Sequence, residues 1–311
     1  MKFKKSNLKK QNLITLIAAM LCIAVFVMFY SASFKNLSLD NAFEFFNTRS
    51  DKALSDDYIK IIDVGQGDSI LIHSNGCTSL FDTGPVDTSN DICLDLEKQG
   101  IKHIDAMLIT HLHMDHVGGL VKIIESYSIG NLIIPDLLNN AEGLPAAKNA
   151  KQAVVNSNGG VYTAIGGMNL NIGEFEITVL AYYNSLSDEN NRSIIAMAEI
   201  DDIKFLLMGD AEKEAENAML DDRINIDCDV LKVAHHGSNT SSQNDFIRKA
   251  SPKYAVISVG EDNTYSHPHK DTTETLKKNG VTVYRTDRDG DVTFYIENGI
   301  MTVATEKGED K

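Results

Sequence analysis

The segment 110–119, THLHMDHVGG, constrains the fold more than any other part of the chain. It follows an apolar run and places four ligand-type side chains within six residues: His111, His113, Asp115 and His116. Neutral imidazoles and carboxylates are ligands for Zn²⁺, Mn²⁺ and Fe²⁺. Alternation puts His111 and His113 on one side of an extended segment, and a turn aims Asp115 and His116 at a neighbouring point. The pattern predicts a metal centre at the end of a strand, with Asp115 also a candidate catalytic residue.

Two later segments repeat the arrangement of an apolar strand that ends in ligand-type residues. The run FLLMGD ends in Asp210, whose carboxylate can bridge two cations or cap the following helix. The run VLKVAHHGS contains His235 and His236. One imidazole, with His235 preferred, is predicted to complete a second metal position, and the other to orient a ligand or touch substrate. Ser238 opens a polar stretch that predicts a helix N-terminus, either an oxyanion site or a simple cap.

Three further segments carry candidate site residues. The polar loop 258–268 contains Tyr265 and His267, which are candidates for stabilising developing charge or protonating a leaving group. Asn263 in the same loop is a candidate substrate contact or support. Asp82 ends a strand in FDTG and is a candidate partner for a metal-bound histidine. Asp68 lies in the Gly-rich segment DVGQGDS, which lacks the GxGxxG spacing and therefore predicts no nucleotide cofactor.

The order of apolar and turn segments predicts the fold class. From Tyr58 to Lys311 no Pro/Gly/Ser-rich linker interrupts the chain, so residues 58–311 are predicted to form one domain. A block of short strands comes first and is followed by strands that alternate with helices, and this succession occurs twice along the chain. This order favours two packed sheets with helices on the outer faces, a four-layer αββα sandwich of the α/β (α+β) class, over a single doubly wound sheet.

The N-terminus predicts attachment to a membrane. Residues 1–12 hold five lysines, and the following run from Leu13 to Tyr30 is uncharged and apolar. Its length nearly matches a bilayer core of about 30 Å, so residues 13–31 are predicted to be a transmembrane helix. The lysines place the N-terminus in the cytoplasm and the domain outside, in a single-pass protein of the cell membrane, with residues 32–57 as the linker. The alternative is a signal peptide cleaved near residue 33, which gives a secreted protein.

The charge of the chain bears on its partners. The formal net charge is −15, and the first twelve residues carry +5, so the remainder carries −20. An acidic body repels nucleic acid at long range. Four basic residues nevertheless lie in or near the ligand-bearing segments: Lys232, Lys270, Arg285 and Arg288.

Taken together, these motifs resemble the metallo-β-lactamase fold superfamily, and within it the extracytoplasmic hydrolase domain of ComEC-type DNA-uptake channel proteins. The resemblance rests on DVGQGDS, FDTG, THLHMDHVGG, LLMGD, LKVAHHGS and the SxGxxNxYxHP run, in this order over about residues 58–296. It implies an αββα fold, two divalent ions (Zn²⁺ or Mn²⁺) and hydrolysis of a phosphodiester or another ester. In that scheme His111 and His113 hold one ion, Asp115, His116 and His235 hold the other, and Asp210 bridges them.

The sequence also departs from this family. The channel segments that accompany the hydrolase domain are missing here, so DNA transport does not carry over. The superfamily's usual histidine between the HxHxDH run and the bridging aspartate is missing, because residues 117–234 contain no histidine. The segment Asn190–Ser193 stands where that ligand would come, so an amide or a water is expected in its place. This favours Mn²⁺ or an exchangeable ion over tightly held Zn²⁺.

Three classes of function remain open at this point. The first is a phosphodiesterase or nuclease that acts outside the cytoplasm, with DNA as a candidate substrate. The second is a hydrolase of a small or cell-wall ester, similar to phosphorylcholine esterases. The acidic surface suits a cationic head group, although the chain has no tryptophan for an aromatic cage. The third is a non-catalytic metal-binding surface protein, which would have no need of so complete a ligand set.

Overall fold

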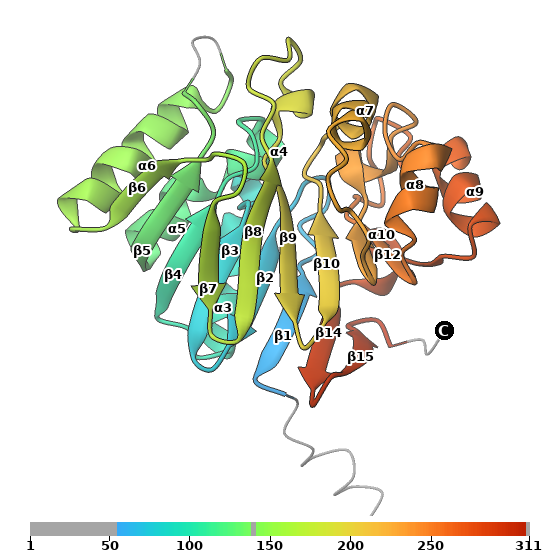
Figure 1. The fold of residues 1–311 in the computed structure, drawn as a ribbon. Coiled ribbons are helices and arrows are strands. Elements are labelled where there is room, and N and C mark those ends of the chain that lie inside the picture. The colour runs from blue at the N-terminus through green and yellow to red at the C-terminus, as the bar shows by residue number, and fades with distance from the viewer. Residues whose placement is uncertain (1–54, 138–140, 309–311) are drawn as a thin grey trace, which may run out of the picture. The chain divides into compact units, whose positions relative to one another are not determined.

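Two β-sheets pack face to face and carry helices on their outer faces (Figure 1). The computed structural model describes residues 55–137 and 141–308. One sheet has eight strands, in the order β15 (Ile300–Thr305), β14 (Val292–Glu297), β1 (Asp57–Ile61), β2 (Ile70–Ser74), β3 (Cys77–Phe81), β4 (His103–Leu108), β5 (Ser128–Ile134) and β6 (Gly160–Thr163). The other has seven, in the order β13 (Thr282–Arg285), β12 (Tyr254–Ile257), β11 (Val230–Lys232), β10 (Ile203–Leu207), β9 (Ile195–Ile200), β8 (Phe175–Ala181) and β7 (Asn169–Ile172).

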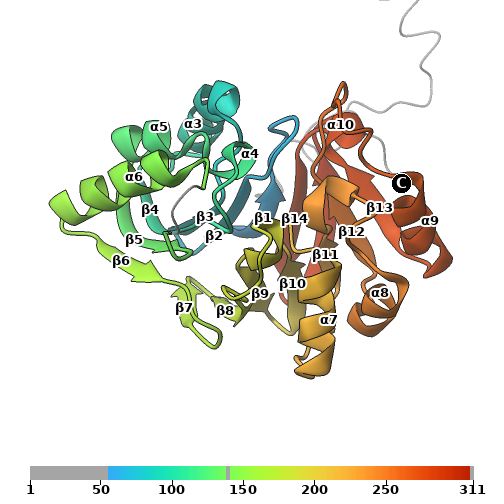
Figure 2. The same ribbon diagram turned by 90° about the horizontal axis from the view of Figure 1, so that it is seen from above.

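The helices divide between the two outer faces (Figure 2). The eight-stranded sheet is covered by α3 (Ser89–Lys98), α5 (Leu120–Ser126) and α6 (Leu144–Asn156), and the seven-stranded sheet by α7 (Lys213–Asp221), α8 (Asn244–Ala250) and α9 (Lys270–Lys278). The short helices in the connections are η1 (Val86–Thr88), α4 (Met114–Val117), η2 (Asn190–Arg192), η3 (Ala234–Gly237) and α10 (Thr286–Asp289). The predicted sandwich of two sheets between helices is confirmed.

Side-chain periodicity explains the central layer. In β8, Phe175, Ile177 and Val179 are buried between the sheets, while the residues between them are more exposed, as a period of two requires. Phe205 of β10 lies 6.5 Å from the Phe175 ring and 5.6 Å from the Phe294 ring, centroid to centroid. Each such aromatic pair adds about 0.5–1.5 kcal/mol beyond area burial, and the pair of Phe205 with Phe294 of β14 helps to hold the two sheets together.

Local turn chemistry fixes the strand register at the start of the domain. Asn75 and Gly76 both have positive φ, 49° and 73°, and join β2 to β3 in a tight hairpin. Asparagine and glycine tolerate this conformation best.

The direction of the strands places the site. Strands β3, β4, β5 and β6 run parallel in one sheet, and β10, β11, β12 and β13 run parallel in the other. The carboxyl ends of both sets lie at the same end of the sandwich, at the top of Figure 1. Loops that follow parallel strands are therefore brought together from both sheets, which is where ligands bind in such folds.

The predicted membrane anchor lies outside the described residues. Residues 55–311 belong to one compact unit. Within the described part of the chain, no helix is both long and apolar enough to cross a bilayer.

Candidate metal centre

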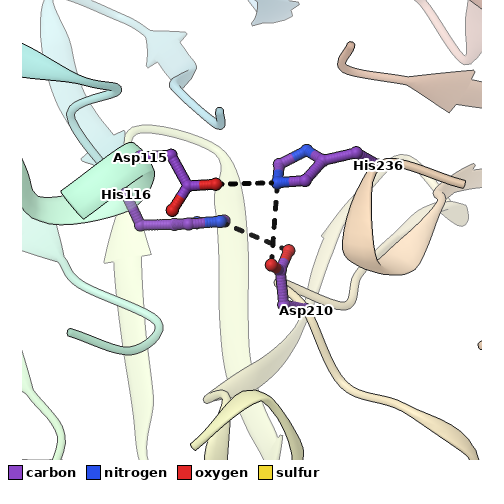
Figure 3. Close-up of side chains that lie close together, drawn as sticks. All are labelled: Asp115, His116, Asp210 and His236. Carbon is purple, nitrogen blue, oxygen red and sulfur yellow. Dashed lines mark ion pairs between the residues drawn. The ribbon is translucent and has the colours of Figure 1, made fainter. Parts of the chain in front are cut away.

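Four side chains from three loops converge at the carboxyl ends of the parallel strands (Figure 3). Asp115 and His116 lie on α4, Asp210 follows β10, and His236 lies in η3. His236 Nε2 is 3.3 Å from Asp115 Oδ2 and 3.6 Å from Asp210 Oδ2. His116 Nε2 is 3.3 Å from Asp210 Oδ1. One donor atom from each residue lies within 4.8 Å of the others, and we call these four residues the inner group.

The inner group fits a divalent cation. His116 Nε2, His236 Nε2 and Asp210 Oδ1 are buried, and none of them has a hydrogen-bond partner. Unpaired polar atoms of this kind are costly in a protein interior unless something else satisfies them. Two imidazole nitrogens and two carboxylates form a donor set suited to Zn²⁺ or Mn²⁺, which would satisfy all of these atoms together.

A second set of imidazoles also faces the Asp210 carboxylate. His111 Nε2 is 3.1 Å from His113 Nδ1 and 3.8 Å from Asp210 Oδ2. His235 Nε2 is 3.9 Å from the same carboxylate oxygen. We call His111, His113 and His235 the outer group. Asp210 is thus within reach of both groups, as a bridging carboxylate must be.

The structure separates the two adjacent histidines that the sequence left open. His236 is buried and belongs to the inner group, whereas His235 faces the outer group and is partly exposed. The assignment of His235 to the same ion as Asp115 and His116 stays a prediction, and the geometry places His236 closer to those two residues. Both histidines adopt the left-handed conformation, with φ of 48° and 52°, which turns their rings toward different points. Such strain costs on the order of 1–3 kcal/mol per residue and clusters at functional sites.

The imidazoles of both groups are oriented from behind. His116 Nδ1 donates to Asp82 Oδ2 at 2.8 Å, and His236 Nδ1 donates to the Ser258 carbonyl at 3.0 Å. On the outer side, His235 Nδ1 lies 2.8 Å from Glu212 Oε1. A donor bond on one ring nitrogen leaves the lone pair of the other free for a metal, so these partners fix the required tautomers.

Asp82 connects the two groups through one hydrogen-bond chain. His111 Nδ1 is 3.1 Å from Thr110 Oγ1, which donates to Asp82 Oδ2 at 2.7 Å. The Thr110 amide also donates to Asp82 Oδ1 at 2.8 Å. Asp68, Asp82 and His116 form another close group of donors, but these bonds occupy the Asp82 oxygens. Asp82 therefore supports the site rather than binding an ion.

Charge in the inner group is mutually stabilised. Burial alone would lower the pKa of His116, but the facing carboxylates of Asp210 and Asp82 raise its pKa well above the usual value. Burial alone would raise the pKa of Asp210, yet His116 and His236 hold its pKa well below the usual value. His111, which burial and His116 disfavour as a cation, has a strongly lowered pKa. Asp210 is therefore ionised and His111 neutral at neutral pH, the forms that bind a metal, whereas His116 is a cation without an ion and would release its proton when a metal binds.

A buried ion pair lies beneath the inner group. Lys232 Nζ donates to Asp68 Oδ2 at 2.8 Å, and both side chains are about 1% exposed. Asp68 Oδ1 is 3.6 Å from His236 Nδ1. Asp68 thus supports the histidine from behind, and Lys232 cannot reach a polyanion at the surface.

A cavity of about 600 Å³ opens above the inner group. Its floor includes Asp115, Asp210 and His236, and its walls include Tyr265 and His267. The Tyr265 ring stacks on the His267 ring, with centroids 5.6 Å apart. His267 Nδ1 is buried without a hydrogen-bond partner. The loop that follows β12 thus places Tyr265 and His267, both predicted site residues, at the cavity above the inner group.

Two predicted substrate contacts have local partners instead. Asn263 donates to the Gly260 and His267 carbonyls, each at 2.8 Å, and so holds the loop that carries His267. Ser238 Oγ accepts from Thr240 Oγ1 at 2.8 Å. The roles of both in substrate binding stay predictions.

The helix N-terminus proposed as an oxyanion site is already occupied. The amides of Ser242 and Gln243, at the start of α8, donate to the buried carboxylate of Glu216. Burial raises the pKa of Glu216 to about 7, against these two amides, which lower it. Of the two interpretations left open for this helix start, these contacts favour the cap, which Glu216 of α7 supplies, and an oxyanion role for the stretch that begins at Ser238 stays a prediction.

Sequence reasoning missed the supporting carboxylates. Glu189 Oε2 lies 3.9 Å from His113 Nε2, and Glu212 backs His235. Glu212 stands two residues after Asp210, and Glu189 directly precedes Asn190. Proximity to ligand-bearing turns was the only signal available for either residue.

Comparison with known proteins agrees with this geometry. Residues 62–261 match the family model described as the metallo-β-lactamase superfamily. The chain is 30% identical over 268 residues to ComE operon protein 3 of Bacillus subtilis, covering 80% of this chain and 34% of that protein. It is 26% identical over 245 residues to competence protein ComA of Neisseria gonorrhoeae, covering 78% of this chain and 32% of that protein. The chain thus spans about a third of the length of these relatives.

Solved structures show the same fold. The metallo-β-lactamase fold protein YhfI from Bacillus subtilis superposes with a TM-score of 0.51 at 11% identity, over 80% of this chain and all of that one. CmlA, a diiron β-hydroxylase from Streptomyces venezuelae, gives a TM-score of 0.53 at 14% identity, over 86% of this chain and 59% of that one. The chain belongs to the metallo-β-lactamase superfamily, as a metal-dependent hydrolase related to the competence proteins.

Proposed function

We propose that this chain is a phosphodiesterase of the nuclease type, anchored in the cell membrane with its hydrolase domain outside the cytoplasm. The observation that carries the proposal is the inner group on the floor of a cavity large enough for a phosphodiester and its flanking groups. The names of the competence relatives add support for a nucleic-acid ester.

The side chains divide the work of hydrolysis. Two bound divalent ions, Zn²⁺ or Mn²⁺, would neutralise charge on the ester and supply a nucleophile from water. Asp210, together with the imidazoles of the inner and outer groups, would hold these ions. Burial, and then the neighbouring His235 and His236, lower the pKa of His267 to about 4. His267 is therefore neutral at neutral pH and acts as a hydrogen-bond donor to a developing oxyanion, and Tyr265 is the phenol beside it that can protonate a leaving group.

One observation favours a small ester as the second candidate. The described residues that line the cavity include the acidic Asp115, Glu142 and Asp210, but no lysine or arginine. A polyanion gains nothing from such walls beyond the ions themselves. A small or cell-wall ester with a cationic head group, such as phosphorylcholine, suits them better.

One assay separates the two candidates. The purified full chain is incubated with bis-p-nitrophenyl phosphate, p-nitrophenyl phosphorylcholine and single-stranded DNA, each with Mn²⁺, Zn²⁺ or EDTA. Asp115→Asn is the inactive variant, and Asp87→Asn, an exposed aspartate in η1, is the matched control. Cleavage of DNA and of the diester, lost with EDTA and Asp115→Asn, supports the nuclease. Cleavage of the choline ester alone moves the assignment to the second candidate.

Membrane attachment is tested separately. The lysines of residues 1–12 and the apolar run of residues 13–30 support an anchor with the N-terminus in the cytoplasm. Protease added to intact cells should remove the domain, and the domain should fractionate with membranes. Recovery of the chain in the culture medium would instead indicate cleavage near residue 33, and recovery in the cytosol would refute the proposal.

A further inference from the structure

The three imidazoles of the outer group do not by themselves make a complete metal site. In the described part of the chain, the inner group closes within 4.8 Å, and no such closed set forms around His111 and His113. We propose that the Asn190 carboxamide completes the outer position together with His111, His113, His235 and Asp210. This mixed nitrogen and oxygen site takes an oxygen-tolerant divalent cation such as Mn²⁺ and releases it more readily than the inner group does.

Three donor pairs of the outer group have the spacing that one ion requires, but the structure does not bring the whole set of described donors within 4.8 Å, so binding would draw them together. Metal bonds of about 2.0–2.2 Å separate neighbouring donor atoms by about 3–4 Å. His111 Nε2 and His113 Nδ1 are 3.1 Å apart, and Asp210 Oδ2 is 3.8 Å from the former. His235 Nε2 is 3.9 Å from the same oxygen.

Asn190 presents an amide at the same place. Its Nδ2 is 3.5 Å from His235 Nε2, and its Oδ1 is buried without a hydrogen-bond partner. It lines the cavity together with His113, His235 and Asp210. A half-turn of the amide exchanges its oxygen and nitrogen, so the oxygen can face an ion while the amino group takes the buried place that Oδ1 now holds.

The backbone that carries Asn190 is held firmly. The Asn190 amide donates to Asp188 Oδ1 at 2.9 Å. The neighbouring Asn191 is buried, and its Oδ1 accepts from the amides of Glu212 and Ala215 at 3.1 Å each. These bonds tie η2 to the start of α7, next to Asp210. Asn190 is therefore presented to the outer group from a fixed turn rather than from a free loop.

The chemistry of the donors predicts weaker binding at the outer position. Three imidazoles, one shared carboxylate and a neutral amide oxygen provide less charge than the two carboxylates of the inner group. The side chains of His113 and His235 are 37% and 23% exposed, whereas those of His116 and His236 are at most 1% exposed. Water therefore competes more effectively at the outer position. The amide oxygen makes the outer position more tolerant of Mn²⁺ than its three imidazoles alone would be.

Binding of Mn²⁺ to the full chain, followed by electron paramagnetic resonance in the absence of substrate, tests this inference. The wild-type chain should bind one ion tightly and one more weakly. Asn190→Ala should weaken the weaker class at least tenfold and leave the tight class unchanged. His236→Ala should remove the tight class. Asn184→Ala, which changes an exposed asparagine in the same connection, is the matched control and should bind both ions as the wild type does.

A gain-of-function variant guards against loss of folding. Asn190→His places an imidazole where the amide stands and should tighten the weaker class for Zn²⁺ at least tenfold. The inference is overturned if Asn190→Ala binds both ions as the wild type does, or if it loses the tight class while remaining folded. Because the measurement uses ions alone, its outcome is independent of which ester the chain cleaves.

Discussion

The inner and outer groups share Asp210 and differ in almost everything else. The inner group combines two carboxylates with two imidazoles, and its histidines are fully buried and held by buried partners, Asp82 and the Ser258 carbonyl. The outer group relies on imidazoles, two of them partly exposed, and its supporting carboxylates Glu189 and Glu212 are each 20% exposed. The two proposed metal positions would therefore differ in how readily each releases its ion, because different partners support the histidines of each group.

The largest effect is expected where the two groups meet. Asp210→Ala should remove both ions, because this carboxylate faces His111, His116, His235 and His236. Loss of metal assistance removes several kcal/mol of transition-state stabilisation, so activity should fall by at least about 100-fold. Metal content per chain, measured by mass spectrometry after dialysis, checks the cause. Retention of one full equivalent would show that the two groups do not share this ligand.

The second-largest effect is expected on stability, when the buried ion pair of Asp68 and Lys232 is broken. Asp68→Ala leaves the Lys232 ammonium buried without its carboxylate, which typically costs about 3–5 kcal/mol. Urea unfolding measures the loss, and the exposed Asp87→Ala should be nearly neutral. Replacing both partners, with Asp68→Leu and Lys232→Met, should recover most of the stability. An unchanged single variant would mean that the pair does not anchor the inner group.

Orientation of the inner histidine should have a smaller effect. Asp82→Asn keeps the shape of the side chain but weakens its hold on His116. Loss of such a partner typically costs 10–100-fold in metal affinity. Only the tighter of the two ions should be affected. An equal effect on both ions would indicate that the chain through Thr110 orients His111 as strongly as Asp82 orients His116.

The smallest effect on metal affinity is expected when the carboxylate that supports His235 in the outer group is replaced. Glu212→Gln removes the carboxylate behind His235, but the Thr240 hydroxyl also lies 3.3 Å from the same ring nitrogen. Affinity for the weaker ion should therefore fall by less than about tenfold, below the lower limit of the buried case. If Glu212→Gln lowered metal affinity as much as Asp82→Asn does, then the burial of the carboxylate behind a histidine would not determine how strongly the ion is held.

The sequence reveals some ligands of each group and leaves others open. Sequence spacing identifies four ligands, His111, His113, Asp115 and His116, and the position after an apolar strand identifies Asp210. The choice between His235 and His236 does not follow from sequence, because two successive left-handed residues aim adjacent rings at different groups. The same limit applies to the supports: a lysine in an apolar strand gives no sign that it is buried against a carboxylate 164 residues away.

The layered fold was more accessible to prediction than the site was. Apolar alternation in β8 and the turn at Asn75 act locally, and the structure follows both. Helix boundaries near the site shifted where tertiary partners intervened. The polar stretch opened by Ser238 was predicted to lead into a helix, and α8 begins only at Asn244, after the Ser242 and Gln243 amides that donate to Glu216.

The ligands of each group come from both sheets, and this has a mechanical consequence. Asp115 and His116 belong to the connection after β4, whereas Asp210 and His236 follow β10 and β11 of the opposite sheet. An ion bound by the inner group would therefore cross-link the two sheets of the sandwich. A ligand present at one hundred times its dissociation constant stabilises the folded state by about 2.7 kcal/mol. The melting temperature of this chain should thus serve as a gauge of metal occupancy, readable without any substrate.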